Sequence, residues 1–266
     1  MLEIIKYLLL GLIQGLTEPL PISSSGHMII FEEIFSFATD LNFKIITNFG
    51  SLIAICIFYR KFLKELIIDS WSYLIKKDTT KKNSFIYILL VALATIPTGI
   101  AGYFLSDIVD EKLSNIFTVA ICLSITGILL LIIDYLSKKA IRNQITTADS
   151  ILIGLSQIVG LIPGISRSGS TTSIGVFRKI KLEDSLRFSF MLYIPISIGS
   201  LILSLTKINY QTTNIVGYIG AFILSILGTL ASIKLLFGIV KKENLKYFGY
   251  YCLLVSISIF IYLLLK

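Results

Sequence analysis

The sequence predicts an all-α polytopic membrane protein, with six transmembrane helices and two re-entrant helical hairpins in an inverted-topology repeat. The first observation is composition. Of the 266 residues, 55% are hydrophobic and only 15% are charged, and the mean hydropathy is +0.86, which excludes an ordinary soluble protein. The second observation is a set of long apolar runs. The third is a motif that occurs twice and is interrupted each time by proline, glycine and serine.

Apolar runs of about 17 to 25 residues predict the spanning helices. They lie at residues 43–59, 85–105, 116–136, 188–204, 215–240 and 248–265. The segment 60–82 is rich in lysine and arginine, so the positive-inside rule predicts a cytoplasmic loop there. The acidic segment 106–114 is predicted to be an outer loop. Each of the three cysteines falls inside an apolar run, where we expect a small buried side chain without a chemical role.

The repeated motif occupies residues 11–27, GLIQGLTEPLPISSSGH, and residues 154–170, GLSQIVGLIPGISRSGS. At this offset of 143 positions, seven of the 17 aligned residues are identical. The first copy alone carries an acid and an imidazole, Glu18 and His27, and the second alone carries a cation, Arg167. A continuous spanning helix is disfavoured in both copies, because prolines and glycines interrupt them.

The topology follows from the basic segment. Counting spans from it, the first motif enters from the outer side and the second from the cytoplasmic side. Three spans separate the copies, and this odd number inverts one copy relative to the other. The predicted organisation is a first repeat at 1–136, a cytoplasmic linker at 137–147 and a second repeat at 148–266. Irregular backbone at membrane depth needs protein or water around it, so both motifs should line one pocket near the midplane.

The second motif predicts an oxyanion site. Arg167 offers a planar fork of donors suited to phosphate, and neighbouring small residues allow close approach of a ligand. Small residues would equally allow close helix packing. The arginine favours the functional interpretation, because an unpaired arginine inside a membrane costs about 2.5 kcal/mol or more. The predicted substrate-binding residues of the two motifs are Ser23, Ser25, Gly26, Gly164, Ser166, Ser168 and Gly169.

The first motif predicts a cation site. Glu18 has no basic residue within four positions, so it needs a partner or a watery cavity. Gln14 precedes it by one helical turn and shares its face. Together they are expected to bind a divalent cation, Mg²⁺ or Ca²⁺, with a diphosphate completing the shell. The alternative is a protonated Glu18 bonded to a backbone carbonyl. His27 is either structural or a catalytic group that moves protons or attacks phosphorus.

EPLPISSSGH at 18–27 and PGISRSGST at 163–171 resemble the two signature loops of the undecaprenyl-diphosphate phosphatases of the bacitracin-resistance type. The resemblance extends to the separation of the loops, to FSFMLYIP at 188–195 and to nearly the whole chain length. It implies metal-dependent removal of the terminal phosphate from undecaprenyl diphosphate at the outer face of the bacterial plasma membrane. That reaction recycles the lipid carrier for cell-wall synthesis. The catalytic residues that the resemblance implies are Glu18, Ser24, His27 and Arg167.

Two departures from the family pattern concern the first motif. Gln14 stands where some members have a second glutamate, which leaves the number of bound metal ions open, and Pro19 replaces a common aromatic residue. The nucleophile also stays open between Ser24, His27 and water. We favour Ser24 assisted by His27, because a hydroxyl needs a nearby base to attack.

The main alternative function is a polyprenyl-phosphate transporter or flippase, because transporters also use inverted repeats with broken helices. The expected partners are the polyprenyl diphosphate substrate, membrane lipid and, as an option, a second copy of the chain, with no role for nucleic acid. Lys44 and Arg187 coincide at the 143 offset. They are secondary candidates for headgroup contact, although snorkelling toward water would explain them equally well.

Overall fold

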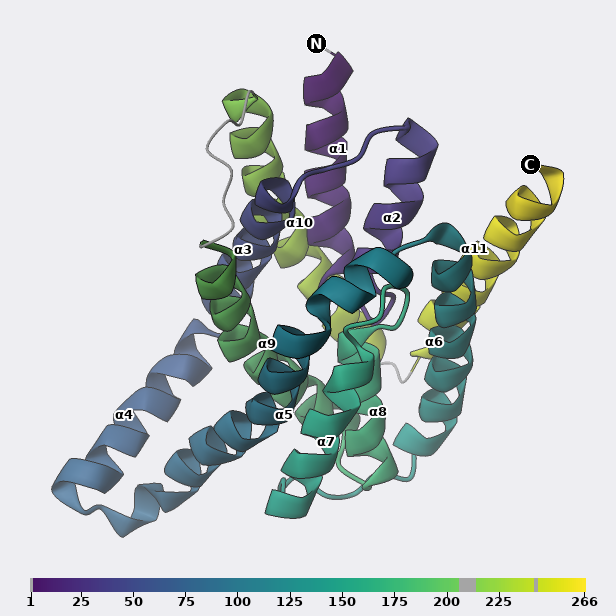
Figure 1. Ribbon diagram of the computed structural model, residues 1–266. Helices are drawn as coiled ribbons and strands as arrows, with labels where there is room; N and C mark the ends of the chain where they lie inside the picture. Colours follow the sequence, from purple (N-terminus) through teal and green to yellow (C-terminus); the bar gives the residue numbers. More distant parts are fainter. Residues whose placement is uncertain (1, 206–213, 242–243) are drawn as a thin grey trace.

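The computed structural model describes residues 2–205, 214–241 and 244–266, and helices joined by turns and short loops make up these ranges (Figure 1). The described residues contain no β-strand, only an isolated bridge between Arg142 and Ile180. The helices are α1 (Leu2–Thr17), α2 (Ser24–Phe35), α3 (Leu41–Phe58), α4 (Arg60–Lys76), η1 (Thr79–Lys81, a 3₁₀-helix), α5 (Lys82–Lys112), α6 (Ile116–Ser137), α7 (Thr147–Val159), α8 (Arg167–Phe177), α9 (Leu182–Leu205), α10 (Ile215–Val240) and α11 (Lys246–Leu265).

Six helices in the described ranges are long and apolar enough to cross a membrane, namely α3, α5, α6, α9, α10 and α11. Each contains one of the six apolar runs found in the sequence, and for α10 the bounds agree at both ends. The prediction of an all-helical, multi-pass membrane protein is therefore confirmed. The motif copies fall outside these spans, in the shorter helices α1, α2, α7 and α8 and in the two turns that join them.

Two predicted loops are wrong, because charge reports the side of the membrane but not the backbone conformation. The segment 60–82 is mostly helical, as α4 and η1. Its apolar residues recur at helical spacing, and Ile67 and Trp71 point away from the protein, each 64% exposed. The acidic segment 106–114 mostly continues α5, which runs through Pro97 to Lys112. Proline is tolerated within membrane helices, because neighbouring groups satisfy the freed backbone carbonyl.

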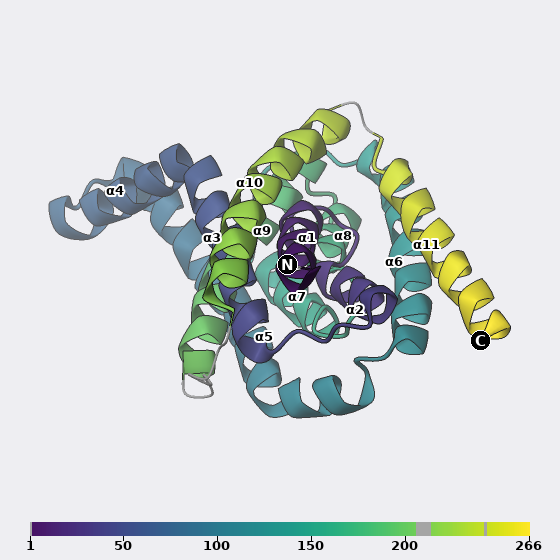
Figure 2. The same cartoon turned by 90° about the horizontal axis from the view of Figure 1, so that it is seen from above.

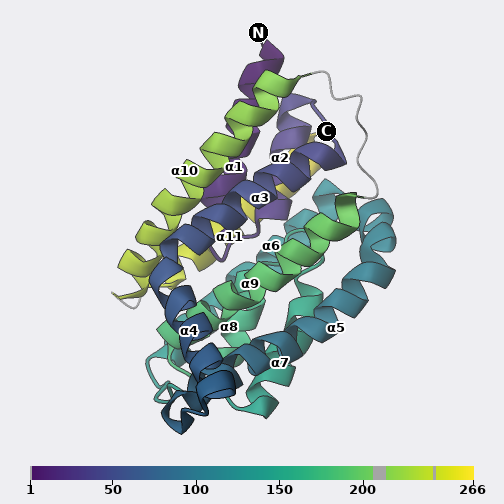
Figure 3. The ribbon, with the colours of Figure 1, turned by 90° about the vertical axis from the view of Figure 1, so that its left-hand side faces the viewer.

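The two motif hairpins lie at the centre of the molecule. Seen from above, α1, α2, α7 and α8 lie inside a ring of longer helices, while α4 projects to one side (Figure 2). The open ends of the α1–α2 hairpin point toward the end that holds both termini, and those of the α7–α8 hairpin point toward the opposite end (Figure 1). On one face of the bundle, α10, α3 and α9 run side by side (Figure 3).

Each hairpin packs on a helix from the other half of the chain. Helix α1 packs against α10, and a Cβ added at Gly11 would overlap the backbone of Ala221. Helix α7 packs against α5, and a Cβ added at Gly154 would overlap the backbone of Ala94. Gly11 and Gly154 are equivalent positions of the repeated motif, so both copies use the same glycine for close helix approach. The hydroxyl of Thr229 adds a hydrogen bond of 3.1 Å to the carbonyl of the first hairpin at Gly15.

Candidate active site

The two hairpin turns touch each other. In the first turn Ser23 has a φ of 68°, and in the second Gly164 has a φ of 95°. A Cβ at Gly26 would lie 3.0 Å from the Cα of Gly164, and a Cβ at Gly164 would lie 2.6 Å from the Cβ of Cys122, so a side chain at either position would force its neighbours to move. The backbone N–H of Gly164 donates to Ser23 Oγ at 3.0 Å. A positive φ costs a serine of order 1 kcal/mol or more, and this contact between the turns helps to hold the strained residue.

Glu18 lies at the centre of a polar cluster built from both turns. One carboxylate oxygen, Oε2, accepts from Ser24 Oγ at 2.5 Å and from Gln14 Nε2 at 2.8 Å. The other, Oε1, forms an ion pair with the guanidinium of Arg167. The Glu18 side chain is only 4% exposed, and that of Arg167 is 23% exposed. Two opposite charges that lie 149 positions apart in the chain therefore meet in the protein interior.

A pocket of about 230 Å³ opens beside this cluster. Its polar residues from the first turn are Glu18, Ser23, Ser24 and Ser25, and those from the second are Ser166, Arg167 and Ser168. Four apolar side chains, Leu20, Leu161, Ile165 and Ile196, also line it. The pocket thus joins a charged floor to an apolar wall, which suits a ligand with an anionic head and a hydrocarbon chain.

Residues at the N-termini of α2 and α8 line the pocket, but three of the predicted substrate-binding residues, Gly26, Gly164 and Gly169, do not. Ser23 caps α2 by accepting from the N–H of Gly26 at 3.3 Å, and Ser166 caps α8 by accepting from the N–H of Gly169 at 3.0 Å. The amide of Gly164 bonds to Ser23 as well. Serine hydroxyls therefore already accept the N–H groups of all three glycines. None of the three lines the pocket.

The first residues of α2 and α8 line the pocket. In each helix the first residues have no partner within the helix for their N–H groups. These residues are Ser24 and Ser25 in α2, and Arg167 and Ser168 in α8. Two helix dipoles therefore converge on one cavity, an arrangement that attracts anions such as phosphate.

The family described as bacitracin resistance protein BacA matches residues 7–258 of the chain. The chain belongs to the BacA family. Among its relatives, the protein named undecaprenyl-diphosphatase from Oceanobacillus iheyensis is 40% identical over 267 residues, covering 98% of this chain and 97% of the relative. Undecaprenyl-diphosphatase 2 from Bacillus thuringiensis is 40% identical over 264 residues, covering 98% of both chains. The undecaprenyl-diphosphatase from Acholeplasma laidlawii is 38% identical over 275 residues, again with 98% coverage of both chains.

His27 does not join the polar cluster of this BacA-family chain. Its ring is 2% exposed and does not line the pocket. Nδ1 lies 2.8 Å from the carbonyl oxygen of Ser23, and Nε2 lies 2.8 Å from the hydroxyl of Tyr251. The Tyr251 ring also stacks on the imidazole, with ring centroids 5.6 Å apart. The expectation that Glu18, Ser24, His27 and Arg167 share one chamber therefore holds for three of the four residues.

Gln14 contacts the cluster from behind Glu18 and does not itself line the pocket. The secondary candidates lie elsewhere. Lys44 forms an ion pair with Glu32 at 3.7 Å, and Arg187 lines a different cavity. Neither basic residue lines the pocket beside Glu18.

The sequence alone did not identify two residues that orient the side chain of Arg167, namely Tyr193 and Asn48. The ring of Tyr193 on α9 lies under the guanidinium of Arg167, 4.2 Å from its central carbon. The Tyr193 hydroxyl bonds at 3.1 Å to the backbone and side-chain oxygens of Asn48 on α3. Tyr193 lies in the FSFMLYIP segment at 188–195, which is part of the family resemblance, but the sequence alone assigned no role to this tyrosine. Asn48 carries no signal in a single sequence, because one asparagine inside an apolar run does not reveal which helix it faces.

Proposed function

We propose that this chain hydrolyses undecaprenyl diphosphate to undecaprenyl phosphate and inorganic phosphate, and so recycles a lipid carrier for cell-wall synthesis. The observation that carries the proposal is the joint position of Ser24, Glu18 and Arg167 at the floor of one pocket. Ser24 serves as the nucleophile, Glu18 as the base and the guanidinium of Arg167 as the anion-binding group, and all three lie in one cluster. The names of the full-length relatives support the same reaction and the same lipid class.

We also propose that the two hairpins are re-entrant and form an inverted repeat, with units at 1–136 and 148–266 joined by 137–147. The local bonds support this, because they recur at the 143 offset. Ser23 and Ser166 each cap their own helix, and they lie 3.4 and 3.3 Å from the hydroxyls of Ser25 and Ser168. His27 and Ser170 each place a side-chain atom 2.8–2.9 Å from the carbonyl of the respective cap.

The proposed orientation places the basic end of the molecule in the cytoplasm and the active site toward the outer side of the bacterial plasma membrane. Lysines and arginines gather where α4, α6 and α7 meet their loops, as the positive-inside rule requires of a cytoplasmic end. Helix α9 starts near this end and runs away from it (Figure 1). The pocket is lined by the far part of α9, at Tyr193, Ile196, Ser197 and Ser200, which supports an outer opening.

In the proposed mechanism, Ser24 attacks the terminal phosphorus. Its proton passes to Glu18 Oε2, the oxygen that already accepts the Ser24 hydrogen bond at 2.5 Å. The new Oγ–P bond forms as the bond from phosphorus to the bridging oxygen breaks, and undecaprenyl phosphate leaves. Glu18 gives the proton to the departing undecaprenyl phosphate. It then accepts a proton from the water that attacks phosphorus and returns that proton to Ser24 Oγ, as the Oγ–P bond breaks and inorganic phosphate leaves. Arg167 and the converging first-turn amides neutralise the charge that develops on the phosphoryl oxygens.

His27 acts in this proposal as a positioning residue. Its bond to the Ser23 carbonyl fixes the strained residue immediately before Ser24. Tyr251 on α11 holds the other ring nitrogen. The resemblance assigned the histidine a catalytic role, whereas the geometry favours Glu18 as the base for Ser24.

A divalent cation, Mg²⁺ or Ca²⁺, completes the proposal. Glu18 would hold it together with the diphosphate, and the ion would supply further charge neutralisation. Gln14 would orient the Glu18 carboxylate from behind, through the 2.8 Å bond from its Nε2. The donor set fits an ion shared with the substrate, because Mg²⁺ often uses one or two carboxylates plus substrate phosphates. Among the described residues, no group of three or more His, Cys, Asp or Glu side chains is placed to form a separate metal site.

The test is phosphate release from undecaprenyl diphosphate by the purified protein in detergent, with chelator and then with Mg²⁺ or Ca²⁺ added back. We expect release that the chelator stops and metal restores, and loss of release in Ser24→Ala and Glu18→Gln. Ser258→Ala, an exposed serine bonded only within α11, is the matched control. A chain that moves polyprenyl phosphate without releasing phosphate would instead be a transporter, and the hydrolase proposal would fail.

The chemical step has its own test. Brief reaction with substrate labelled in the terminal phosphate should leave label on Ser24. If active enzyme never acquires label under rapid quenching, while Ser24→Ala still releases phosphate, then water activated by Glu18 is the attacking group.

A further inference from the structure

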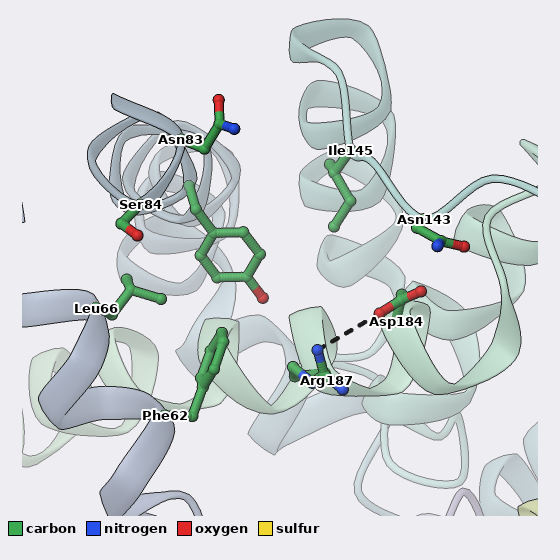
Figure 4. Close-up of a pocket in the computed structure, with 9 residues that line it drawn as sticks. Phe62, Leu66, Asn83, Ser84, Asn143, Ile145, Asp184 and Arg187 are labelled. Atoms are coloured by element: carbon green, nitrogen blue, oxygen red, sulfur yellow. Dashed lines mark ion pairs between the residues drawn. The ribbon is translucent and has the colours of Figure 1, made fainter. Parts of the chain in front are cut away.

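A second cavity of about 250 Å³ lies at the basic end of the molecule. It shares no lining residue with the pocket beside Glu18. Four segments enclose it: α4 contributes Phe62, the start of α5 contributes Asn83 and Tyr87, the α6–α7 connection contributes Asn143, and the start of α9 contributes Asp184 and Arg187 (Figure 4). Elements that are distant in the sequence thus build one site.

Arg187 has donors to spare in this cavity. Its guanidinium lies 3.5 Å from the Asp184 carboxylate, one turn away on the same helix (Figure 4), and 5.4 Å from the ring of Phe62. Across the described ranges, no hydrogen bond joins this guanidinium to another residue. Five N–H donors in a planar fork match the oxygens of a phosphate group. The side chain is 41% exposed, so a ligand can reach it.

Tyr87 provides a second donor. Its hydroxyl is buried and has no hydrogen-bond partner among the described residues. The ring is held edge-on between Phe62 and Phe188, with centroid distances of 5.7 and 5.6 Å. A buried hydroxyl without a partner costs about 1–3 kcal/mol. A ligand oxygen in the cavity would remove that cost. Asn83 and Asn143 also line the cavity.

The cavity lies where a phospholipid headgroup would reach it. Helix α4, which forms one wall, turns an apolar stripe outward: Ile67, Ile68, Trp71, Leu74 and Ile75 are each more than half exposed. Lysines and arginines flank this stripe at both ends of the helix. Such a pattern is typical of a helix that lies in the membrane interface, with Trp at headgroup depth. The cavity behind α4 is smaller than the roughly 300–1,000 Å³ of sites for drug-sized ligands, so it suits a headgroup.

We propose that this cavity binds a phosphate group between Arg187 and Tyr87. The group is supplied either by the headgroup of a lipid in the adjacent leaflet or by free phosphate. In this site Asp184 competes with the ligand for Arg187. The proposal does not depend on the proposed hydrolase activity, because no residue is common to the two sites.

Binding is tested on the purified, delipidated full-length protein in detergent by equilibrium dialysis. The probes are inorganic phosphate, dihexanoyl phosphatidic acid and, as a phosphate-free control, dihexanoylglycerol. Arg187→Ala should remove one bound phosphate per chain or weaken that site by about tenfold or more, as loss of a charged donor predicts. Lys61→Ala, an exposed cation next to Phe62, should leave binding unchanged.

Two variants with smaller changes of side chain keep the test valid even if Arg187→Ala fails to fold. Tyr87→Phe should weaken the same site, because it removes only the hydroxyl, and Asp184→Asn should strengthen it. Tighter binding of phosphatidic acid than of inorganic phosphate assigns the site to a lipid headgroup, and equal binding assigns it to free phosphate. Unchanged binding of both phosphate probes in Arg187→Ala and in Tyr87→Phe overturns the proposal. The site beside Glu18 is scored separately with Arg167→Ala, so the failure of either idea can be recognised.

Discussion

Removal of the Arg167 side chain is the most informative perturbation of the polar cluster. Arg167 makes the ion pair with Glu18 and stacks on Tyr193 at 4.2 Å. Arg167→Ala leaves the Glu18 carboxylate, which is 4% exposed, with hydrogen bonds from Ser24 and Gln14 only. Breaking a buried pair in this way costs about 3–5 kcal/mol, and loss of the ring contact adds about 0.5–2 kcal/mol.

The effect on catalysis should be about as large as the effect on folding, because a 10³- to 10⁵-fold loss of rate corresponds to about 4–7 kcal/mol. A guanidinium that stabilises a transferring phosphoryl group is worth about 10³ to 10⁵ in rate, so we expect phosphate release by Arg167→Ala to fall by about 10³-fold or more. Arg167→Lys should recover little, because a point charge cannot replace a planar fork. Release is measured per folded molecule, with folding followed by size-exclusion chromatography and thermal unfolding in detergent.

Two controls separate the stability and rate effects. The double variant Glu18→Gln with Arg167→Ala removes the orphaned charge, so it should unfold at a higher temperature than Arg167→Ala alone and remain inactive. Arg178→Ala removes a guanidinium just after the end of the same helix, where it bonds to Asp149 at 2.7 Å, and should keep most of the activity per folded molecule. Release by Arg167→Ala within tenfold of the parent, or near-complete rescue by lysine, would refute the assignment.

Three further predictions concern other parts of the molecule. Tyr251→Phe should lower stability by about 1 kcal/mol or more, because the 2.8 Å bond to His27 is lost. Phosphate release should fall by less than tenfold, and its pH profile should not change. A shifted pH profile would show that His27 exchanges protons with substrate. Gly11→Val and Gly154→Val should each destabilise the folded protein by about 1–3 kcal/mol through overpacking. Gly99→Ala is the control, because a Cβ added there meets nothing within 4 Å, and it should leave thermal unfolding unchanged. Equal losses of stability at all three positions would contradict the packing described. Burial alone would raise the pKa of the Asp149 carboxyl, but bonds from Arg142, Arg178 and Thr146 outweigh it and hold that pKa below its usual range. A depressed pKa contributes stability above the unfolded value near 3.9 that is lost as pH falls below it. Asp149→Asn should therefore cost about 2 kcal/mol at pH 7 and progressively less below about pH 4; a pH-independent cost in unfolding experiments would refute this.

Much of this fold is readable in the sequence, because a membrane span needs only a long apolar run. Helix α10 was bounded correctly at both ends for this reason. Helix α4 was missed because its charges dominate the composition of segment 60–82, while its apolar stripe is visible only when the residues are placed on a helix. The continuation of α5 beyond residue 105 was missed because acidic residues in a helix that leaves the membrane look the same as acidic residues in a loop.

The cluster of Glu18, Ser24 and Arg167 was predictable because two aligned motifs place unlike residues at matching positions. The position of His27 was not. Its ring does not line the pocket and lies against α11, where Nε2 is 2.8 Å from the hydroxyl of Tyr251. That partner, Tyr251, lies 224 positions later in the chain, and no local pattern connects the two. Long-range partners such as Tyr193 and Asn48 were missed for the same reason.

The packing of α1 on α10 has a consequence for biosynthesis. The N-terminal hairpin leaves the ribosome first, yet the surface that receives it is made last: about 200 residues must follow, which takes roughly 10–40 s at about 5–20 residues per second. Until residue 167 has been made, Glu18 in the strained first turn lacks its ion-pair partner Arg167. Until α10 has been made, the first hairpin of the new chain lacks its packing surface, because α1 packs on α10. Chains halted after residue 205 should therefore remain sensitive to added protease at the first hairpin, and early protection would disprove this order of assembly.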